Sequence, residues 1–360
     1  MIVLFPADPL IHPYFGAVLY GIAAAATALL LTALLTALLR APARRLRLFD
    51  RRRQREVPLS GGPAVVLVTG AVVGAGHWIG IAPPLDDEVL ELLVAGGVVA
   101  VLGFVDDVWR LRRRVLAVGT AVAAACVVPY GETGIGSGLL AVGWVVCATL
   151  GFRGLDHADG LAGAVGVVTA FGAGACAAIE VMDGIAVLMS ALAAALTGFL
   201  VHNWHPARAA LGASGSMSAG FVLAGGVVYA RAGQGLGESA GVLCALTAVV
   251  GADAVLVLVA RRLDGRAVLR SGPDHLGHRL RRLGLTVHGA TLLLVFGAFS
   301  GVLVGVLAHA GWVGTDALWW VAGVALAVVL ALSRVRVYGP RSPRRPVSPQ
   351  VSAPLRVRNG

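Results

Sequence analysis

The chain has 360 residues, of which 58% are hydrophobic and only 13% are charged, and its mean hydropathy is +0.84. A soluble domain of this length needs far more charge on its surface, so the composition excludes that class and indicates a polytopic membrane protein. The formal net charge is +10, all 29 basic residues are arginines, and the four cysteines lie singly in apolar runs, without the spacing of a zinc site or a disulfide framework.

Eleven apolar runs follow one another along the chain. They cover residues 14–39, 63–82, 89–105, 115–130, 138–152, 160–181, 184–202, 215–230, 239–260, 288–310 and 317–332. Runs of about 20 apolar residues are long enough to cross a bilayer core. The first run is too long for a signal peptide, no positive residue precedes it, and Arg40 follows it directly. We therefore predict an all-α membrane protein with about eleven transmembrane helices.

The arginines lie almost entirely in alternate connections. If the eleven runs are spans, 28 of the 29 arginines fall on one side of the membrane and Arg231 alone falls on the other. The positive-inside bias then places the basic loops and the C-terminus in the cytoplasm and the N-terminus outside. Residues 338–360 are rich in Pro, Arg and Ser, so we predict a membrane domain over residues 1–337 and a disordered basic tail that lies on anionic headgroups.

Two acidic pairs lie at the predicted cytoplasmic boundary. Asp106 and Asp107 end the third run, and adjacent carboxylates persist most easily beside a metal, a basic ligand or an arginine. Asp156 and Asp159 follow the fifth run, and their spacing places both on one face of a first helical turn, where they could hold a cation or orient a polar ligand. The alternatives are neutralisation by nearby arginines for the first pair and simple helix capping for the second.

Three further groups of polar residues lie near the same boundary. Gly212, Gly215 and Ser216 form a turn before a predicted helix and could offer backbone N–H groups to a phosphate, although such a turn is weak evidence alone. His275 and His278 lie among arginines, a composition that suits a diphosphate or, alternatively, an amphipathic helix on anionic lipid. A carboxylate inside the ninth run (residue 253) should face a polar cavity or a partner, or else be a protonated structural group.

Taken in this order, these segments resemble the polyprenyl-phosphate N-acetylhexosamine-1-phosphate transferase superfamily. The resemblance runs from about residue 49 to residue 285. The family pattern comprises a Pro-x-x-Gly-Gly loop, an Asp-Asp pair, an Asn-x-x-Asp-Gly-x-Asp-Gly-Leu segment, an Asn-x-x-Pro-Ala segment, a Gly-Asp-x-Gly-Ser turn and a His-x-His-His loop. The matching residues are Pro58, Gly61, Gly62, Asp106, Asp107, Asp156, Asp159, Gly160, Leu161, Asn203, Pro206, Ala207, Gly212, Gly215, Ser216, His275 and His278.

The resemblance implies transfer of a sugar 1-phosphate from a UDP-N-acetylhexosamine to a polyprenyl phosphate, with release of UMP. It implies a plasma-membrane enzyme with a cytoplasmic active face and Mg²⁺ as cofactor, which initiates a cell-wall or surface-glycan lipid such as that of peptidoglycan. We expect no nucleic-acid partner, and a homo-oligomer stays open.

The resemblance also assigns roles to individual residues. It implies catalytic roles for Asp106, Asp107 and Asp159, and a metal site at Asp156 and Asp159. The remaining residues expected to bind substrate are Asp156, Arg153, Asn203, Gly212, Gly215, Ser216, His275, His278 and Arg279. If this assignment holds, Asp106, Asp159 and His278 face one pocket at the inner membrane surface.

Four positions depart from the family pattern. Arg153 stands in place of Asn, His157 in place of Gly, Ala213 in place of Asp, and Gly277 in place of the middle His. The missing Asn and Asp are positions that the resemblance assigns to Mg²⁺, and a methyl group cannot ligate a hard cation. Arg153 brings a fixed positive charge that either partly replaces the metal or blocks its site. Hence a catalytically silent homologue that binds lipid phosphate or nucleotide is the alternative. A transporter fits less well, because its polar residues would lie near the midplane.

Overall fold

The computed structural model describes residues 11–50, 55–78, 86–263, 265 and 274–335, and over these residues the chain is helical with no strand. The helices are α1 (Ile11–Arg45), α2 (Gly61–Trp78), α3 (Asp87–Trp109), α4 (Arg113–Val127), α5 (Tyr130–Leu155), α6 (Leu161–Ile179), α7 (Asp183–Asn203), α8 (Gly212–Ala230), α9 (Leu236–Leu246), α10 (Ala248–Leu263), α11 (Leu276–Arg282), α12 (Val287–His309) and α13 (Asp316–Ser333). The predicted disordered tail, residues 338–360, lies outside the described residues.

The all-α fold predicted from the apolar runs is confirmed, and it is the fold of a multi-pass membrane protein. Each apolar run corresponds to one helix except the ninth, which forms α9 and α10, two helices that meet at 84° around Thr247. Among the described residues, eight helices are long and apolar enough to cross a membrane, or nine if the bent pair counts as one span. The predicted number of eleven spans and the sides of the two termini therefore stay predictions.

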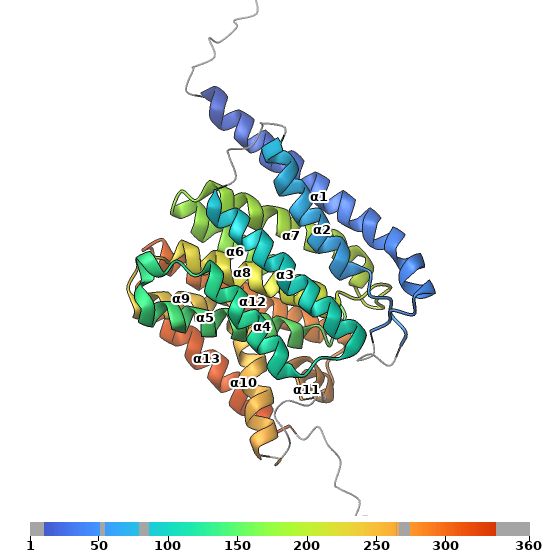
Figure 1. Cartoon of the computed structure of the whole chain (residues 1–360). Coiled ribbons are helices and arrows are strands. Elements are labelled where there is room, and N and C mark those ends of the chain that lie inside the picture. Colours follow the sequence, from blue (N-terminus) through green and yellow to red (C-terminus); the bar gives the residue numbers. More distant parts are fainter. Residues whose placement is uncertain (1–10, 51–54, 79–85, 264, 266–273, 336–360) are drawn as a thin grey trace, which may run out of the picture.

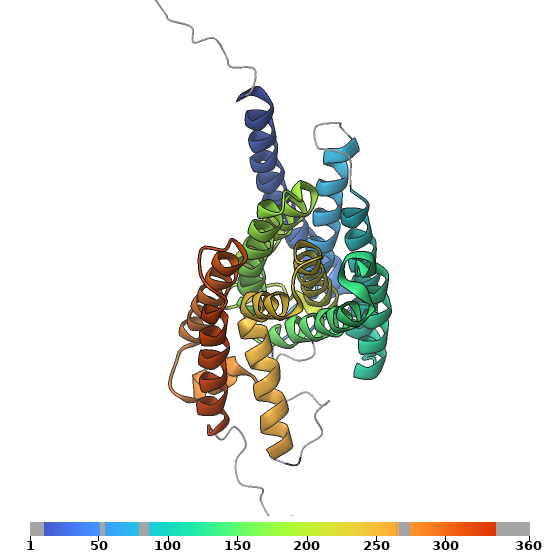
Figure 2. The same cartoon turned by 90° about the vertical axis from the view of Figure 1, so that its left-hand side faces the viewer.

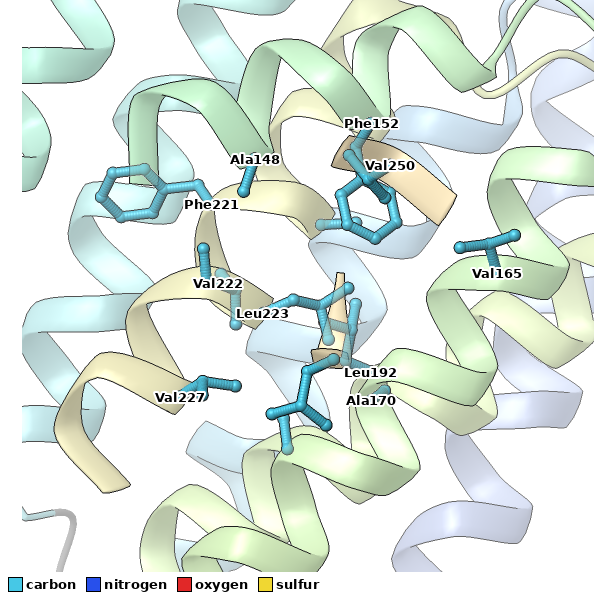
Figure 3. Close-up of a cluster of buried hydrophobic side chains, with 14 of the residues drawn as sticks. Ala148, Phe152, Val165, Ala170, Leu192, Phe221, Val222, Leu223, Val227 and Val250 are labelled. Carbon is cyan, nitrogen blue, oxygen red and sulfur yellow. The ribbon is translucent and has the colours of Figure 1, made fainter. Parts of the chain in front are cut away.

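Helix α8 is the centre of the bundle (Figure 1). All 19 of its residues are buried, and it packs against α2, α3, α5 and α6. Small residues permit this close approach: a Cβ added at Gly220 would lie 2.8 Å from Cβ of Phe152 on α5. Figure 3 shows Phe152, Ala170 and Leu192, from α5, α6 and α7, gathered in the core around Leu223 of α8. The central helix therefore contacts protein on all sides.

The break between α9 and α10 separates α10 from the main bundle. α10 runs beside α13 and also contacts α5. Figures 1 and 2 both show α10 and α13 lying together at one end of the molecule, away from α1 and α2. The short helix α11 follows α10 at this end. The ends of α3, α5 and α10 and the helix α11 thus surround a common space.

Candidate functional site

A cavity of about 1590 Å³ occupies this space. Its walls come from the end of α3, the end of α5 and the loop after it, α10, α11, the start of α12, and loop residues near 49–59 and 205–207. Asp106, Asp159 and His278 all line it, so the structure brings these distant residues to one cavity, as the sequence analysis expected. Their chemical roles stay predictions.

Asp106 and Arg153 both line the cavity and form an ion pair with each other. Nε of Arg153 donates to Oδ2 of Asp106 at 3.1 Å, and Nη2 contacts the same oxygen. The side chain of Asp106 is 4% exposed and that of Arg153 is 14% exposed. The arginine that replaces the family asparagine therefore neutralises the first acid of the Asp-Asp pair, and the pair is shielded from most of the solvent.

The second acid, Asp107, caps the N-terminus of the central helix. Its two carboxylate oxygens accept hydrogen bonds from the backbone N–H groups of Ala213, at 2.9 Å, and Ser214, at 3.1 Å. Oδ2 of Asp156 accepts from the N–H of Gly212 at 2.9 Å. Carboxylates stabilise a helix N-terminus because they satisfy its unpaired N–H groups and interact favourably with the helix dipole. Asp107 and Asp156 thus both hold α8 at the edge of the site.

This capping changes the role expected for the glycine turn. Gly212, Gly215 and Ser216 are buried and are absent from the described residues that line the cavity, and Oγ of Ser216 donates to the carbonyl of Gly212 at 2.6 Å. The N–H groups at the start of α8 bind carboxylates of the chain, so they do not face a phosphate. Gly212 itself has φ +71°, and an added Cβ would lie 2.7 Å from Oδ2 of Asp107. The turn therefore joins α8 to the acids rather than to a ligand.

Asp159 and Asn203 organise the next loop. Oδ2 of Asp159 accepts from the N–H of Ala207 at 3.1 Å and contacts Nδ1 of His205 at 2.7 Å. Asn203 is 1% exposed; its side chain accepts from the N–H of Gly160 at 2.9 Å and donates to a loop carbonyl at 2.8 Å. Asp159 lines the cavity, whereas Asn203 is not among the described lining residues. Asn203 thus fixes the loop, and its predicted substrate-binding role stays a prediction.

Three histidines form a cluster in the cavity wall. The rings of His157 and His275 are stacked, with centroids 4.3 Å apart, and His278 lies 4.8 Å from His157. Nδ1 of His275 lies 2.7 Å from Oδ2 of Asp253, whose other oxygen accepts from the N–H of Leu276 at 2.7 Å. The intramembrane acid therefore has the polar partner that its position predicted. All three histidines and Asp253 line the cavity.

Burial keeps two of these imidazoles neutral. It lowers the pKa of His157 to about 3, and the nearby His275 lowers it further in the same direction. Burial also lowers the pKa of His278, with smaller contributions from His275 and Arg281. A neutral imidazole carries one N–H donor and one acceptor, and Nδ1 of His157 lies 2.9 Å from the carbonyl of Gly154, which identifies Nδ1 as the donor. The cluster can thus orient a ligand without carrying a full charge at each ring.

Arg279 was expected to bind a diphosphate, a role that stays a prediction, and in the structure its side chain binds backbone carbonyls instead. Its side chain is 3% exposed, and Nη1 donates to the carbonyls of Leu332 and Val335, each at 2.7 Å. These carbonyls belong to the last turn of α13 and the residues after it, so Arg279 caps that helix. Arg279 is also absent from the described residues of the cavity wall.

Sequence reasoning missed most of the cations in the cavity. Besides Arg153, the described lining residues include the arginines Arg55, Arg110, Arg112, Arg113, Arg114, Arg261 and Arg281. Their density in the basic loops was visible in the sequence, but which of them turn inward was not. Apolar side chains from three helices also line the cavity: Leu150, Val257, Leu258 and Leu294. The cavity can therefore accept a ligand with both a phosphate and a hydrocarbon part.

The residues present fit a Mg²⁺ ion poorly. The Asp106 carboxylate binds Arg153, Asp107 and Asp156 cap α8, and Asp159 contacts His205 and a backbone N–H. The Ala213 side chain is fully buried and offers no oxygen. Over the described residues, no three His, Cys, Asp or Glu side chains are grouped to hold a metal ion.

Comparison with known proteins identifies the family. The family described as glycosyl transferase family 4 matches residues 89–231. A protein of Streptomyces coelicolor, provisionally named a glycosyltransferase, is 64% identical over 343 residues, which are 94% of this chain and 83% of that protein. The chain belongs to glycosyl transferase family 4. The matched range contains both acidic pairs and all of α8, so the family region and the capped end of the central helix coincide.

Two other relatives of the chain carry more specific names. The decaprenyl-phosphate N-acetylglucosaminephosphotransferase of Mycolicibacterium smegmatis is 27% identical over 300 residues, 71% of this chain and 72% of that protein. The phospho-N-acetylmuramoyl-pentapeptide-transferase of Desulforudis audaxviator is 30% identical over 253 residues, 60% of this chain and 72% of that protein. The family is one of polyprenyl-phosphate sugar-phosphate transferases, which agrees with the resemblance found from the sequence motifs.

Proposed function

We propose that this protein transfers a sugar 1-phosphate from a UDP-N-acetylhexosamine to a polyprenyl phosphate at the cytoplasmic face of the plasma membrane and releases UMP. The observation that carries the proposal is the composition of the cavity described above. Eight arginines and several apolar helix side chains line it together, which suits a nucleotide diphosphate beside a phosphate attached to a hydrocarbon chain. The product would initiate a cell-wall or surface-glycan lipid.

In the proposed reaction, an oxygen of the lipid phosphate attacks the phosphorus that bears the sugar. A new diphosphate bond forms, the bond between the two phosphates of the UDP-sugar breaks, and UMP leaves with the electron pair. A phosphate monoester has a second pKa near 6 and is already largely ionised at neutral pH, so the attack needs no strong base. This chemistry is compatible with an Asp106 carboxylate that is engaged by Arg153.

The chain's own residues would stabilise the developing charge. Arg153 at the end of α5 and Arg281 on α11 both line the cavity and would offer fixed guanidinium groups to the diphosphate oxygens. Asp159 would orient His205 at the loop that closes one side. Asp106 would hold Arg153 in place, so its role is to position the cation rather than to take a proton.

Mg²⁺ is expected from the family resemblance, but the engaged carboxylates argue for a different source of positive charge. We propose that Arg153 supplies at the Asp106 carboxylate the charge that a divalent cation would bring. A guanidinium is always protonated and binds phosphate through two N–H groups. If so, transfer should continue when divalent ions are chelated.

A catalytically silent protein that binds lipid phosphate or nucleotide is the second candidate. The observation in its favour is the same ion pair, because an acid held by Arg153 is no longer open to a metal. The distinguishing experiment incubates the purified protein with undecaprenyl phosphate and each of several UDP-N-acetylhexosamines, with Mg²⁺ or EDTA, and measures UMP. UMP release from one donor supports the transferase; UDP binding without UMP from any donor supports the silent protein.

A further inference from the structure

His157 touches both histidines of the following loop. It lies between α5 and α6, and its ring stacks on His275 at 4.3 Å with an angle of 18° between the planes. The same ring lies 4.8 Å from His278, tilted by 39°. A hydrogen bond between Nδ1 and the carbonyl of Gly154 at 2.9 Å fixes its orientation. One side chain from the α5–α6 loop thus contacts two imidazoles that lie 118 and 121 positions later in the sequence.

Gly277 lies directly opposite His157. A Cβ added at Gly277 would lie 3.1 Å from Nε2 of His157, which is tighter than most real Cβ contacts, so the imidazole would have to shift by a few tenths of an ångström. The backbone of Gly277 does not adopt the positive φ that demands glycine, since it is absent from the positive-φ glycines of the described residues. The imidazole of His157, and not the backbone, is therefore what restricts a side chain at position 277.

These two residues are also two of the four departures from the family pattern. The pattern has glycine where this chain has His157, and histidine where it has Gly277. In the structure the two positions meet, so the departures compensate each other: one loop has gained an imidazole and the loop in contact with it has lost one. Compensation between contacting residues is expected when both serve one packing arrangement.

We propose that His157 is a positioning residue that holds His275 and His278 against the cavity, in the space that a histidine at position 277 would otherwise fill. The remaining anchor of the cluster is Asp253, which binds His275 through Nδ1 and the backbone of Leu276. The ligand served would be the diphosphate of the nucleotide sugar, so this part of the inference rests on the proposed function. The contact of His157 with Gly277 and with the two histidines does not depend on the proposed function.

The test is a double-mutant cycle of wild type, His157→Gly, Gly277→His and the double variant. We expect each single variant to lose about tenfold in kcat/KM, chiefly through KM, because the first leaves the histidines unsupported and the second forces two rings into one space. The double variant should return to within a few-fold of wild type. His157→Phe, which keeps a ring to stack, should retain most activity; loss equal to that of His157→Gly would refute a positioning role.

Two further measurements separate this inference from the proposed function. Thermal unfolding of the four proteins and their affinity for UDP, followed by calorimetry, should show the same recovery in the double variant even if no UMP forms. Gly237→His is the matched control, because a Cβ there meets nothing within 4 Å and the residue lies on α9. Combined with His157→Gly, it should give no recovery. Additive effects in the His157–Gly277 cycle, in both unfolding and UDP affinity, would overturn the inference.

Discussion

Replacing Arg153 by Met tests the central electrostatic contact of the site. The substitution keeps an unbranched side chain of similar length and removes the guanidinium from Asp106, which is only 4% exposed. Breaking a fully buried pair costs about 3–5 kcal/mol because a charge is left without compensation. Since Arg153 is 14% exposed and faces a cavity, water can partly solvate the remaining carboxylate, and we expect a loss of about 2 kcal/mol.

The assay is thermal and denaturant unfolding of the purified protein in detergent, together with UMP release. Asp106→Asn in the Arg153→Met background removes the uncompensated charge and should restore most of the lost stability. UMP release should fall by about 10²-fold or more in both variants, since a preorganised charge at the reacting phosphate is removed. Arg208→Met is the control, because Arg208 is exposed and is not among the described residues of the cavity.

Unchanged stability of Arg153→Met would refute the view that the ion pair neutralises a buried carboxylate. Unchanged UMP release would refute the proposed role of its charge in the reaction. Loss of wild-type UMP release in EDTA, with recovery on added Mg²⁺, would show that Arg153 does not replace a metal ion. These three results address the fold, the chemistry and the cofactor separately.

Three further predictions concern residues whose roles the structure revises or defines. Arg279→Met should lower the free energy of unfolding by about 2 kcal/mol, because α13 loses its cap, while the KM for the nucleotide sugar stays unchanged. Ala213→Asp should destabilise the protein and give no metal-dependent activity, since the new carboxylate would be buried beside Asp107; chelator-sensitive UMP release would contradict this. The pKa of His157 is about 3 in the folded protein and about 6.5 in the unfolded chain, so the unfolded chain binds the proton more strongly. The free energy of unfolding should therefore be highest above pH 6.5 and should fall as the pH drops towards 3. At pH 5 we expect a loss of about 2 kcal/mol, which His157→Phe should abolish in unfolding measured against pH.

The helices could be predicted from the sequence because a bilayer demands long apolar segments. The break at Thr247 could not, since residues 239–260 read as one apolar run without proline. Tertiary contacts accompany the bend: α9 packs on α12 and α13, whereas α10 packs on these helices and also on α5. The sequence predicts that a segment is apolar and buried from water, but it does not predict against which helices the segment packs.

The residues of the site could be predicted in part. Asp106, Asp159, His275 and His278 were found from their charge and order, and the structure places all four in one cavity. The direction of a side chain is harder to read. Asn203 is polar and lies near the site, but it is committed to the backbone of a neighbouring loop.

The partners of the backbone N–H groups explain the failure at the glycine turn. Gly212 binds a carboxylate 56 residues earlier, and Ala213 binds one 106 residues earlier. A glycine-rich turn before a helix has the same sequence whether its N–H groups meet a phosphate or an acid from the chain. Only the packing of α3 and α5 around α8 decides between the two.

The complete enclosure of α8 has a consequence for biogenesis. Its mean hydropathy, 1.3, is the lowest among the eight long apolar helices, and its first turns carry Ser214, Ser216 and Ser218. Such a segment enters lipid less readily than its neighbours do, yet the four helices with which it packs most extensively all precede it in the chain. During synthesis α8 therefore leaves the ribosome when its protein surroundings already exist, and it can pass from the translocon into them with little exposure to acyl chains.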